Sequence, residues 1–424
     1  MKKFILALLF TCLVFAQDQK TTLSADEALD KLVKGNQHWV ENKLQFIHQN
    51  SSIRYKTAKE GQHPFATILT CSDSRVSPEL IFDQGVGDLF VIRVAGNVVD
   101  TDELASIEYG VEHLETPVLL VLGHSGCGAV TAAYKSWKHK TEDTHSNIPE
   151  LLHKIEPAIK KSYKEHPDLG EKSLIDASVS ANVRMVIDNI LKMSEGTKKK
   201  VLAGKLKVVG AVYNTYHGHI NWLFTPDDVL KILRKGNQHW SSDKMQHPHH
   251  SIDLRHIQAV EGQLPIFTII TCSDSRVIPE LIFDQGVGDA FVIRVAGNIL
   301  GGDELASIEY GVKHLQTPLL LVLGHSSCGA VTAALDHVQH PDHEQHGNIP
   351  KLISKIEPAV REAQKDLKKG ENLLDKSIVV NVRTTHKQII EKSEAARKQI
   401  AEGRLKIVSA VYNIETGKVE WLDD

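Results

Sequence analysis

The chain has 424 residues, 42% of them hydrophobic and 24% charged, which is an ordinary globular composition and excludes a disordered chain, a collagen and a coiled coil. The formal net charge of −4 argues against nucleic acid as a partner, because nucleic-acid-binding surfaces are usually basic. Five cysteines in a chain of this length are too few for a scaffold built on disulfides.

The amino-terminal 16 residues have the pattern of a secretory signal peptide. Two lysines precede an apolar run from Phe4 to Ala16, which is shorter than the ~20 residues needed to span a bilayer. A basic start, a short apolar run and a small residue at its end predict a signal peptide at residues 1–16, cleaved after Ala16. We therefore expect an exported mature protein, periplasmic or secreted, with no membrane span. An uncleaved anchor and lipid attachment at Cys12 are the alternatives.

The remainder of the chain is one domain written twice. The segment from Cys71 to Cys127 aligns without a gap on the segment from Cys272 to Cys328, and 47 of the 57 positions are identical. The repeat length, near 200 residues, is far longer than the unit of a solenoid, so it indicates a duplicated domain.

The two copies are predicted to occupy residues 21–223 and 224–424. A capping-box pattern at Ser24–Glu27 opens the first copy. Thr225 and Pro226 open the second with a cap residue and a proline at the first helical position. Because no Gly/Ser- or Pro-rich linker separates the copies, we expect them to pack together.

Short apolar runs alternate with helical patterns along each copy. In the first copy we expect strands at 65–70, 89–94, 118–122 and 206–212, and helices at 102–114, 129–137 and 179–193. Strands rich in Val, Leu and Ile and separated by helices predict an α/β fold, with a mostly parallel four-stranded sheet flanked by helices on both faces. The stretch 217–222 predicts a hairpin that adds an antiparallel edge strand. In such sheets, sites form at the carboxyl ends of the strands.

Cysteine and histidine residues follow two of these strands. Cys71 comes directly after the first strand, and His124 and Cys127 follow the third; the second copy repeats them as Cys272, His325 and Cys328. Two thiolates and one imidazole suit zinc. Three protein ligands leave the fourth tetrahedral position for water, as in catalytic zinc sites. The sequence therefore predicts two Zn²⁺ ions per chain, one in each copy.

A disulfide in each copy is the alternative, since an exported protein meets an oxidising compartment. In the first copy it would join Cys71 to Cys127. It does not explain the histidine three residues before the second cysteine, nor Asp73 and Arg75 beside the first. The alternative for Asp73 and Arg75 is a structural ion pair at a turn.

The combination of motifs resembles the β-class carbonic anhydrase family. Cys-Ser-Asp-Ser-Arg at 71–75 is followed by Arg-Val-Ala-Gly-Asn at 93–97, Ile-Glu-Tyr at 107–109 and Gly-His-Ser-Gly-Cys-Gly at 123–128. The second copy repeats this series with one substitution, Ser327 in place of Gly126. The resemblance covers nearly all of the mature chain in two stretches, 26–222 and 227–421.

The resemblance implies a role for each motif residue. Zinc would be bound by the two cysteines and the histidine of each copy. Asp73 would accept a hydrogen bond from zinc-bound hydroxide and Arg75 would pair with Asp73, as Asp274 and Arg276 would in the second copy. The family's substrate-pocket residues correspond to Gln62, Phe90, Tyr109, Gln263, Phe291 and Tyr310. Two further arginines, Arg93 and Arg294, are interpreted more simply as packing or interface charges.

The implied activity is the reversible hydration of carbon dioxide to bicarbonate and a proton, at one site per copy. Carbon dioxide is apolar and electrophilic, so it needs a small apolar pocket and a strong nucleophile, and zinc-bound hydroxide is available near neutral pH. The alternatives are hydrolysis of a related heterocumulene, such as carbonyl sulfide or carbon disulfide, and a non-catalytic zinc-binding protein. Because the family forms dimers, the copies are expected to pair as an intramolecular pseudo-dimer, and a further homo-oligomer is allowed.

Overall fold

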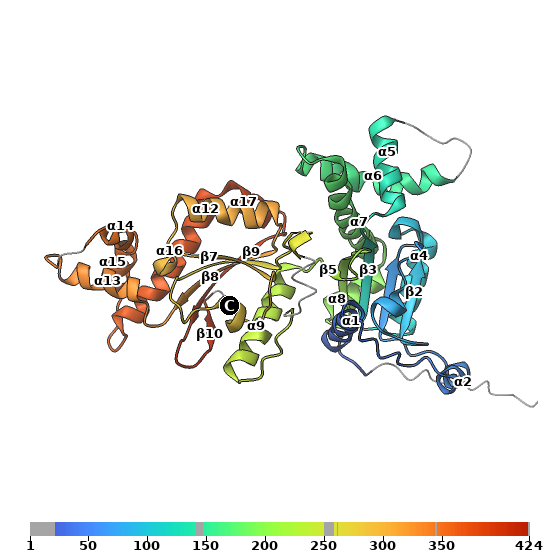
Figure 1. Cartoon of the computed structure of the whole chain (residues 1–424), viewed down its shortest axis with the longest axis horizontal. Helices are drawn as coiled ribbons and strands as arrows, with labels where there is room; N and C mark the ends of the chain where they lie inside the picture. Colours follow the sequence, from blue (N-terminus) through green and yellow to red (C-terminus); the bar gives the residue numbers. More distant parts are fainter. Residues whose placement is uncertain (1–21, 141–146, 250–257, 261, 344–345, 423–424) are drawn as a thin grey trace, which may run out of the picture. The chain divides into compact units, whose positions relative to one another are not determined.

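The computed structural model describes residues 22–140, 147–249, 258–260, 262–343 and 346–422. The predicted signal peptide and Cys12 lie outside the described residues. The chain divides into two compact units, one ending at Leu223 and the other starting at Phe224 (Figure 1). Within the described ranges, no helix is both long and apolar enough to cross a membrane.

Unit 1 holds one five-stranded sheet and its covering helices. Its elements are α1 (Ala25–Val40), α2 (Ser51–Glu60), β1 (Ala66–Thr70), α3 (Pro78–Ile81), β2 (Leu89–Arg93), η1 (Ala95–Asn97), α4 (Thr101–Glu108), η2 (Tyr109–His113), β3 (Val118–His124), α5 (Gly128–His139), α6 (Ile148–Glu165), α7 (Glu171–Met193), α8 (Glu195–Leu202), β4 (Lys207–Tyr213) and β5 (Ile220–Trp222). The strand order is β2-β1-β3-β4-β5. β1 to β4 are parallel, and β5 pairs antiparallel with β4. The predicted α/β fold is confirmed.

Unit 2 repeats this architecture. Its elements are α9 (Pro226–Ser241), β6 (Phe267–Thr271), α11 (Pro279–Ile282), β7 (Ala290–Arg294), η3 (Ala296–Asn298), α12 (Gly302–Glu309), η4 (Tyr310–His314), β8 (Leu319–His325), α13 (Gly329–Gln339), α14 (Ile349–Ile353), α15 (Glu357–Lys365), α16 (Leu373–Lys392), α17 (Glu394–Ala401), β9 (Lys406–Tyr412) and β10 (Val419–Trp421). The strand order is β10-β9-β8-β6-β7, with β10 antiparallel to β9.

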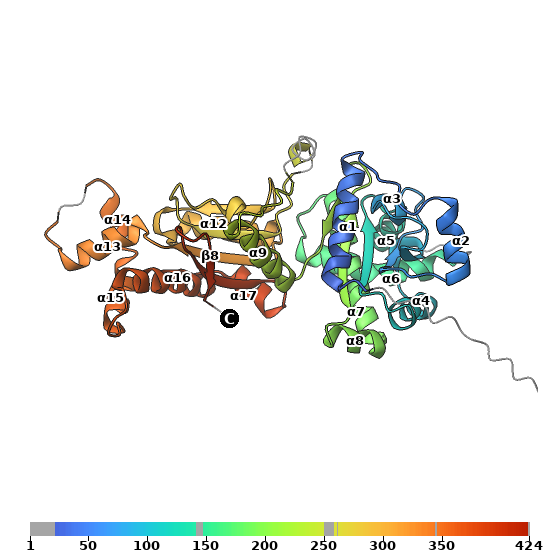
Figure 2. The ribbon, with the colours of Figure 1, turned by 90° about the horizontal axis from the view of Figure 1, so that it is seen from below.

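The central strands are apolar because helices cover both faces of each sheet. Every residue of β1 and β3 is buried, which is why their sequences are nearly continuous hydrophobic runs. In unit 2, α12 and α16 lie on one side of the sheet and α9 on the other (Figure 1). In unit 1, α1 lies alongside the strands (Figure 2). Each unit therefore has a hydrophobic core of its own.

The predicted single helix at 102–114 is interrupted. The α-helix α4 ends at Glu108, and the next five residues form the wider π-helical turn η2. Gly110 in this turn packs against β1, since a Cβ atom there would lie 2.3 Å from Oγ1 of Thr67 and 3.0 Å from Cδ1 of Phe90. The π-helical turn thus depends on packing between a helix and a strand, which the 3.6-residue spacing of the apolar side chains does not reveal.

Candidate metal centre

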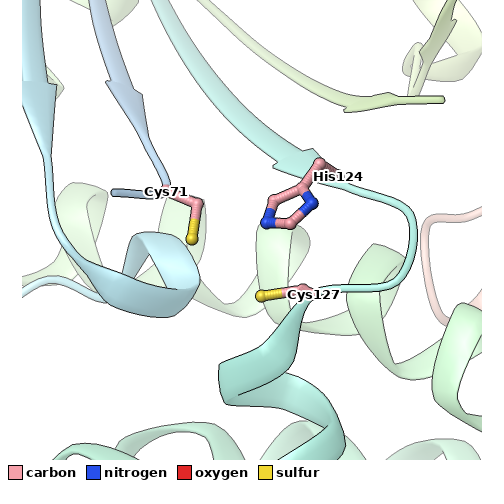
Figure 3. A group of neighbouring side chains, drawn as sticks. All are labelled: Cys71, His124 and Cys127. Carbon is pink, nitrogen blue, oxygen red and sulfur yellow. The ribbon is translucent and has the colours of Figure 1, made fainter. Parts of the chain in front are cut away.

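Two cysteines and one histidine converge at the carboxyl edge of the sheet in each unit. In unit 1, Cys71 follows β1, His124 ends β3 and Cys127 precedes the first turn of α5. Because β1 and β3 are neighbouring parallel strands, these side chains meet and point toward one another (Figure 3). Their ligand atoms lie within 4.8 Å of one another, and all three residues are buried. Unit 2 groups its counterparts in the same way: Cys272, His325 and Cys328.

The histidine of each group is held in the tautomer that a metal ligand requires. Nδ1 of His124 lies 3.0 Å from the carbonyl oxygen of Ser125, and it must donate there because a carbonyl only accepts. In the neutral ring, Nε2 then carries the lone pair. Nε2 is buried and has no hydrogen-bond partner among the described residues. His325 repeats this, with Nδ1 2.9 Å from the Ser326 carbonyl oxygen and Nε2 unpartnered within the described part.

The cysteines of both groups are free thiols, so the disulfide alternative is not realised. Sγ of Cys272 and Sγ of Cys328 lie 4.0 Å apart, roughly twice the ~2.05 Å of a disulfide bond. Two sulfurs that bind one zinc tetrahedrally at ~2.3 Å stand roughly 3.8 Å apart. A hydrogen bond from Cys127 lowers the pKa of the Cys71 thiol, and the same bond raises the pKa of Cys127. The pair thus keeps a proton that a bound divalent ion would displace.

A carboxylate lies beside each group. Oδ2 of Asp73 is 3.9 Å from Nε2 of His124. Arg75 holds this carboxylate with two parallel hydrogen bonds, Nε to Oδ1 at 3.0 Å and Nη2 to Oδ2 at 2.8 Å. These bonds hold the pKa of Asp73 well below its ordinary value, so the carboxylate is ionised and only accepts hydrogen bonds. The second unit repeats the pair with the same geometry: Asp274 and Arg276.

Three hydrogen bonds to the loop that carries Cys71 and Asp73 were missed by sequence reasoning. The Gly96 amide donates to Sγ of Cys71 at 3.3 Å. Arg93 donates from Nε to the Cys71 carbonyl oxygen at 3.1 Å and from Nη2 to the Asp73 carbonyl oxygen at 2.6 Å. Arg93 therefore binds the loop that carries the site, and Arg294 does the same in unit 2. The only signal for this in the sequence is that the Arg-Val-Ala-Gly-Asn motif follows the first cysteine at the same spacing in both copies.

We expect Gly96→Ala to destabilise unit 1 by about 2–3 kcal/mol, since left-handed backbone costs a non-glycine residue ~1–2 kcal/mol and overpacking adds to this. Gly96 has a φ of +68°, and a Cβ atom there would lie 2.6 Å from Cδ1 of Ile155. Urea unfolding of the zinc-loaded variant measures the loss. Gly204→Ala is the matched control, because Gly204 has a φ of +66° but open space around its Cβ position. Equal losses in the two variants would contradict the steric part of this explanation.

The predicted aromatic pocket residues do not gather at the metal centre of their own unit. The rings of Phe90 and Tyr109 contact each other, with centroids 5.8 Å apart. Phe90 pairs with Thr67 in the sheet, four residues before Cys71, which places it roughly 13 Å from that end of the strand. Tyr109 is 47% exposed. The two rings thus form a partly exposed aromatic pair away from the zinc ligands of unit 1.

The other predicted pocket residues are the aromatic pair of unit 2 and the two glutamines. Phe291 and Tyr310 pair with centroids 5.7 Å apart, and Tyr310 is 46% exposed. Gln62 and Gln263 are exposed, and neither makes a hydrogen bond to any residue of the described ranges. The structure therefore brings together the predicted zinc ligands, aspartates and arginines, and leaves the predicted aromatic pocket residues apart from them.

The fold and the site define a class of protein. It is a duplicated α/β protein in which each unit has one cysteine–histidine–cysteine group that could hold a metal ion. Two soft sulfurs, an imidazole nitrogen without a partner and a neighbouring carboxylate fit Zn²⁺ in an open, catalytic type of site.

Comparison with known proteins identifies the family. The sequence model of the family described as carbonic anhydrase matches residues 66–220 and 267–419, one stretch in each unit. Carbonic anhydrase 2 of Mycobacterium tuberculosis (strain CDC 1551 / Oshkosh) is 38% identical over 193 residues, which cover 46% of this chain and 91% of that protein. The carbonic anhydrase of Mycolicibacterium smegmatis is 35% identical, covering 46% and 92%. A solved structure of the beta-carbonic anhydrase CcaA aligns at 28% identity over 48% of this chain and 96% of that one, with a TM-score of 0.39. The chain belongs to the carbonic anhydrase family, as a tandem of two β-class copies.

Proposed function

We propose that each unit reversibly hydrates carbon dioxide to bicarbonate and a proton. The observation that carries the proposal is the convergence, in both units, of two free thiols and an unpartnered imidazole Nε2 beside an arginine-held aspartate. Membership of the carbonic anhydrase family supports the same reaction.

The residues that would hold Zn²⁺ are the buried groups of each unit: Cys71, His124 and Cys127, and Cys272, His325 and Cys328. When bound, the ion supplies acidification of a water molecule, which makes a strong nucleophile available near neutral pH. The Ser125 carbonyl oxygen keeps the proton of His124 on Nδ1, so Nε2 stays free to bind. The Gly96 amide hydrogen bond favours the thiolate form of Cys71, because a hydrogen bond to the charged form stabilises it.

Asp73 would orient the reacting oxygen. An ionised carboxylate accepts but does not donate hydrogen bonds, so it would accept a hydrogen bond from the O–H of the nucleophile and leave a lone pair directed at the carbon of the substrate. Arg75 keeps both carboxylate oxygens engaged, which prevents Asp73 from occupying the open metal position. Arg93 fixes the peptide groups of Cys71 and Asp73, so the ligand and the orienting carboxylate keep their relative positions.

The pocket for carbon dioxide would be completed by the other copy. Gln62, Phe90 and Tyr109 belong to the implied pocket. The two aromatic residues do not approach the zinc ligands of unit 1, and Gln62 makes no hydrogen bond to any described residue. A pseudo-dimer would supply these three residues to the metal centre of unit 2 and their counterparts to that of unit 1. Fusion of the copies raises the effective concentration of the partner, to the millimolar scale for short linkers, so the pair would survive the dilution that an exported protein meets. The pattern of residues 1–16 supports the proposed export.

Metal and thiol analysis tests the metal assignment directly. We expect two zinc ions per mature chain by elemental analysis and four titratable thiols after chelation under denaturing conditions, because four thiolates and two imidazoles make two three-ligand groups. The same preparation should hydrate carbon dioxide in a stopped-flow assay. Two disulfides in fully active protein would overturn the metal assignment, and zinc-loaded protein without hydration activity would overturn the proposed function.

A single-site background tests the pseudo-dimer. Cys127→Ser leaves only the metal centre of unit 2, and Cys328→Ser leaves only that of unit 1. We expect Gln62→Ala to lower hydration roughly tenfold in the Cys127→Ser background, as loss of one hydrogen bond to a charged group would, and to have no effect in the Cys328→Ser background. The reverse pattern would mean that each glutamine serves its own unit, and the pseudo-dimer proposal would fail.

A further inference from the structure

A groove of about 250 Å³ in unit 2 runs along α16, and none of its lining residues belongs to the metal centre. We call it the α16 groove. One part of its wall is apolar and consists of Ile299, Leu300 and Pro358. The α16 part is polar, with Asn381, Thr384, Thr385 and Gln388, of which Asn381 and Thr385 are almost fully buried. All four side chains offer hydrogen-bond donors, and in a helix they share one face.

Two lysines complete the groove. Lys355 and Lys392 line it, and no carboxylate oxygen of the described residues lies within 4.0 Å of either ammonium nitrogen. Glu304 lies close to Lys355, since a Cβ atom at Gly301 would be 2.5 Å from Oε2 of Glu304 and 3.1 Å from Nζ of Lys355. Its carboxylate accepts a hydrogen bond from the Gly301 amide at 2.8 Å and so caps α12. The groove therefore combines two unpaired positive charges with several neutral donors.

Unit 1 provides an internal comparison, because the charge of the corresponding lysine is neutralised there. Lys154, the counterpart of Lys355, forms an ion pair with Asp100. The counterpart of Asp100 in unit 2 is Gly301, so Lys355 has lost that partner. A Cβ atom at Gly301 would lie 3.1 Å from Nζ of Lys355, which shows how directly an aspartate there would face the lysine.

The helix that lines the groove also differs between the units, and in unit 2 it is more polar. Thr384, Thr385 and Lys392 of unit 2 stand where unit 1 has Met185, Val186 and Met193. Asn182 and Asn189 of unit 1 keep amides at the places of Asn381 and Gln388. The unit 1 face is thus more apolar and its lysine is paired, whereas the unit 2 face has two added hydroxyls and two lysines without an ion-pair partner among the described residues. Loss of the Asp100 carboxylate, gain of the Lys392 ammonium group and gain of the Thr384 hydroxyl all favour a negatively charged occupant.

We propose that the α16 groove binds a small, multiply charged oxyanion, such as a phosphate or a dicarboxylate, and that unit 1 has no equivalent site. The lysine ammonium groups pair with the anionic oxygens. The Thr384 hydroxyl and the Gln388 amide donate to the remaining lone pairs, because the hydroxyl proton of Thr385 is already donated to a backbone carbonyl oxygen. The site does not depend on the hydration reaction, and its residues include none of the zinc ligands.

The groove also touches the turn that supports the metal ligands. Asn381 donates from Nδ2 to the Gly297 carbonyl oxygen at 2.8 Å, and Thr385 donates from Oγ1 to the Asn298 carbonyl oxygen at 2.9 Å. The Gly297 amide in turn donates to Sγ of Cys272 at 3.3 Å. Asn381, which lines the groove, is therefore linked to the predicted zinc ligand Cys272 through a single residue, Gly297.

Isothermal titration of the zinc-loaded protein with inorganic phosphate and, separately, with succinate tests the proposal. We expect one anion to bind per chain, with Lys355→Met and Lys392→Met each weakening binding roughly tenfold, the loss of one charge-assisted contact. Gly301→Asp should weaken it similarly, because it restores the carboxylate that unit 1 has at this place. Lys154→Met in unit 1 is the matched control and should bind as the parent protein does.

The two probes distinguish the source of the anion, since binding of phosphate alone indicates a phosphate ligand and binding of succinate alone a carboxylic acid. Either result supports the proposal if the unit 2 variants weaken it. Two results would overturn it. The first is no binding of either probe at about 10 millimolar, a concentration that would detect even a very weak site. The second is equal binding by the parent and all variants. Equal binding would place the anion at the metal centres or elsewhere.

Discussion

Replacing Asp73 and Asp274 together by asparagine is expected to lower the rate of carbon dioxide hydration by at least about 100-fold, the usual scale for removing one preorganised polar group. Both zinc ions should stay bound, because neither residue belongs to the cysteine–histidine groups. An amide can donate to the nucleophile and turn its lone pair away from the substrate. It also loses the charge that Arg75 and Arg276 grip with two hydrogen bonds each.

Stopped-flow hydration with a pH indicator, together with elemental analysis of zinc, measures both parts of this prediction. Asp26→Asn with Asp227→Asn is the matched control, since these aspartates form one exposed ion pair per unit, with Lys207 and Lys406. The control should keep its activity. Near-normal turnover of the zinc-loaded Asp73 and Asp274 double variant would refute the orienting role.

The factor by which the Asp73 and Asp274 double variant loses hydration rate, relative to the parent protein, should be the same at pH 6 and at pH 8. Hydrogen bonds from Arg75 hold the pKa of Asp73 well below its ordinary value, so the carboxylate is charged throughout that range. Because the pKa of Asp73 is lower in the folded than in the unfolded protein, its ionisation stabilises the fold at any pH above the unfolded-state pKa of ~3.9. This stabilisation is lost as the pH falls from there through the folded-state pKa. An effect that vanished at pH 6 would mean that Asp73 titrates there, contrary to its pairing.

Removing one thiol from each metal centre is expected to have the largest effect of any substitution. In the Cys127→Ser, Cys328→Ser double variant, zinc content and hydration should both fall to background, because a serine hydroxyl is a poor substitute for a thiolate on zinc. The single variant Cys127→Ser should keep one zinc ion and roughly half of the hydration rate, since each unit has its own ligands and its own core.

Elemental analysis and stopped-flow hydration of the three proteins check this series. Circular dichroism serves as the control for folding, because the substituted side chain is buried and similar in size to the original. Full zinc and full activity in the double variant would overturn the ligand assignment. Loss of both zinc ions in the single variant would mean that the two centres are coupled rather than independent.

Much of the fold and the metal centre was predictable because their signals are local or periodic. Apolar runs separated by helical patterns indicated a covered parallel sheet, and the structure has it. Cys71 and Cys127 are 56 positions apart, yet both follow strands of that sheet, and carboxyl ends of neighbouring parallel strands share one edge. Strand ends and motif types were therefore sufficient to predict that the thiols and His124 meet.

The π-turn at Tyr109–His113 was not predictable in this way. It depends on the close approach of Gly110 to Thr67, and no short-range pattern in the sequence records the distance between a helix and a strand. The same holds for Arg93, whose two acceptors are backbone carbonyl oxygens of another strand end. Backbone acceptors are present at every residue, so the sequence does not indicate which of them an arginine binds.

By itself, the sequence determined the duplication, the α/β class and the identity of the residues that suit zinc, because repeats, periodicity and ligand chemistry are properties of residue type and spacing. Only the tertiary structure decided that His124 carries its proton on Nδ1, that Gly96 donates to the Cys71 sulfur and that Lys355 lacks the partner that Lys154 has. The physical reason is range: hydrogen bonds and ion pairs act over a few ångströms, and only the packing of the folded chain brings groups that are distant in sequence within that range.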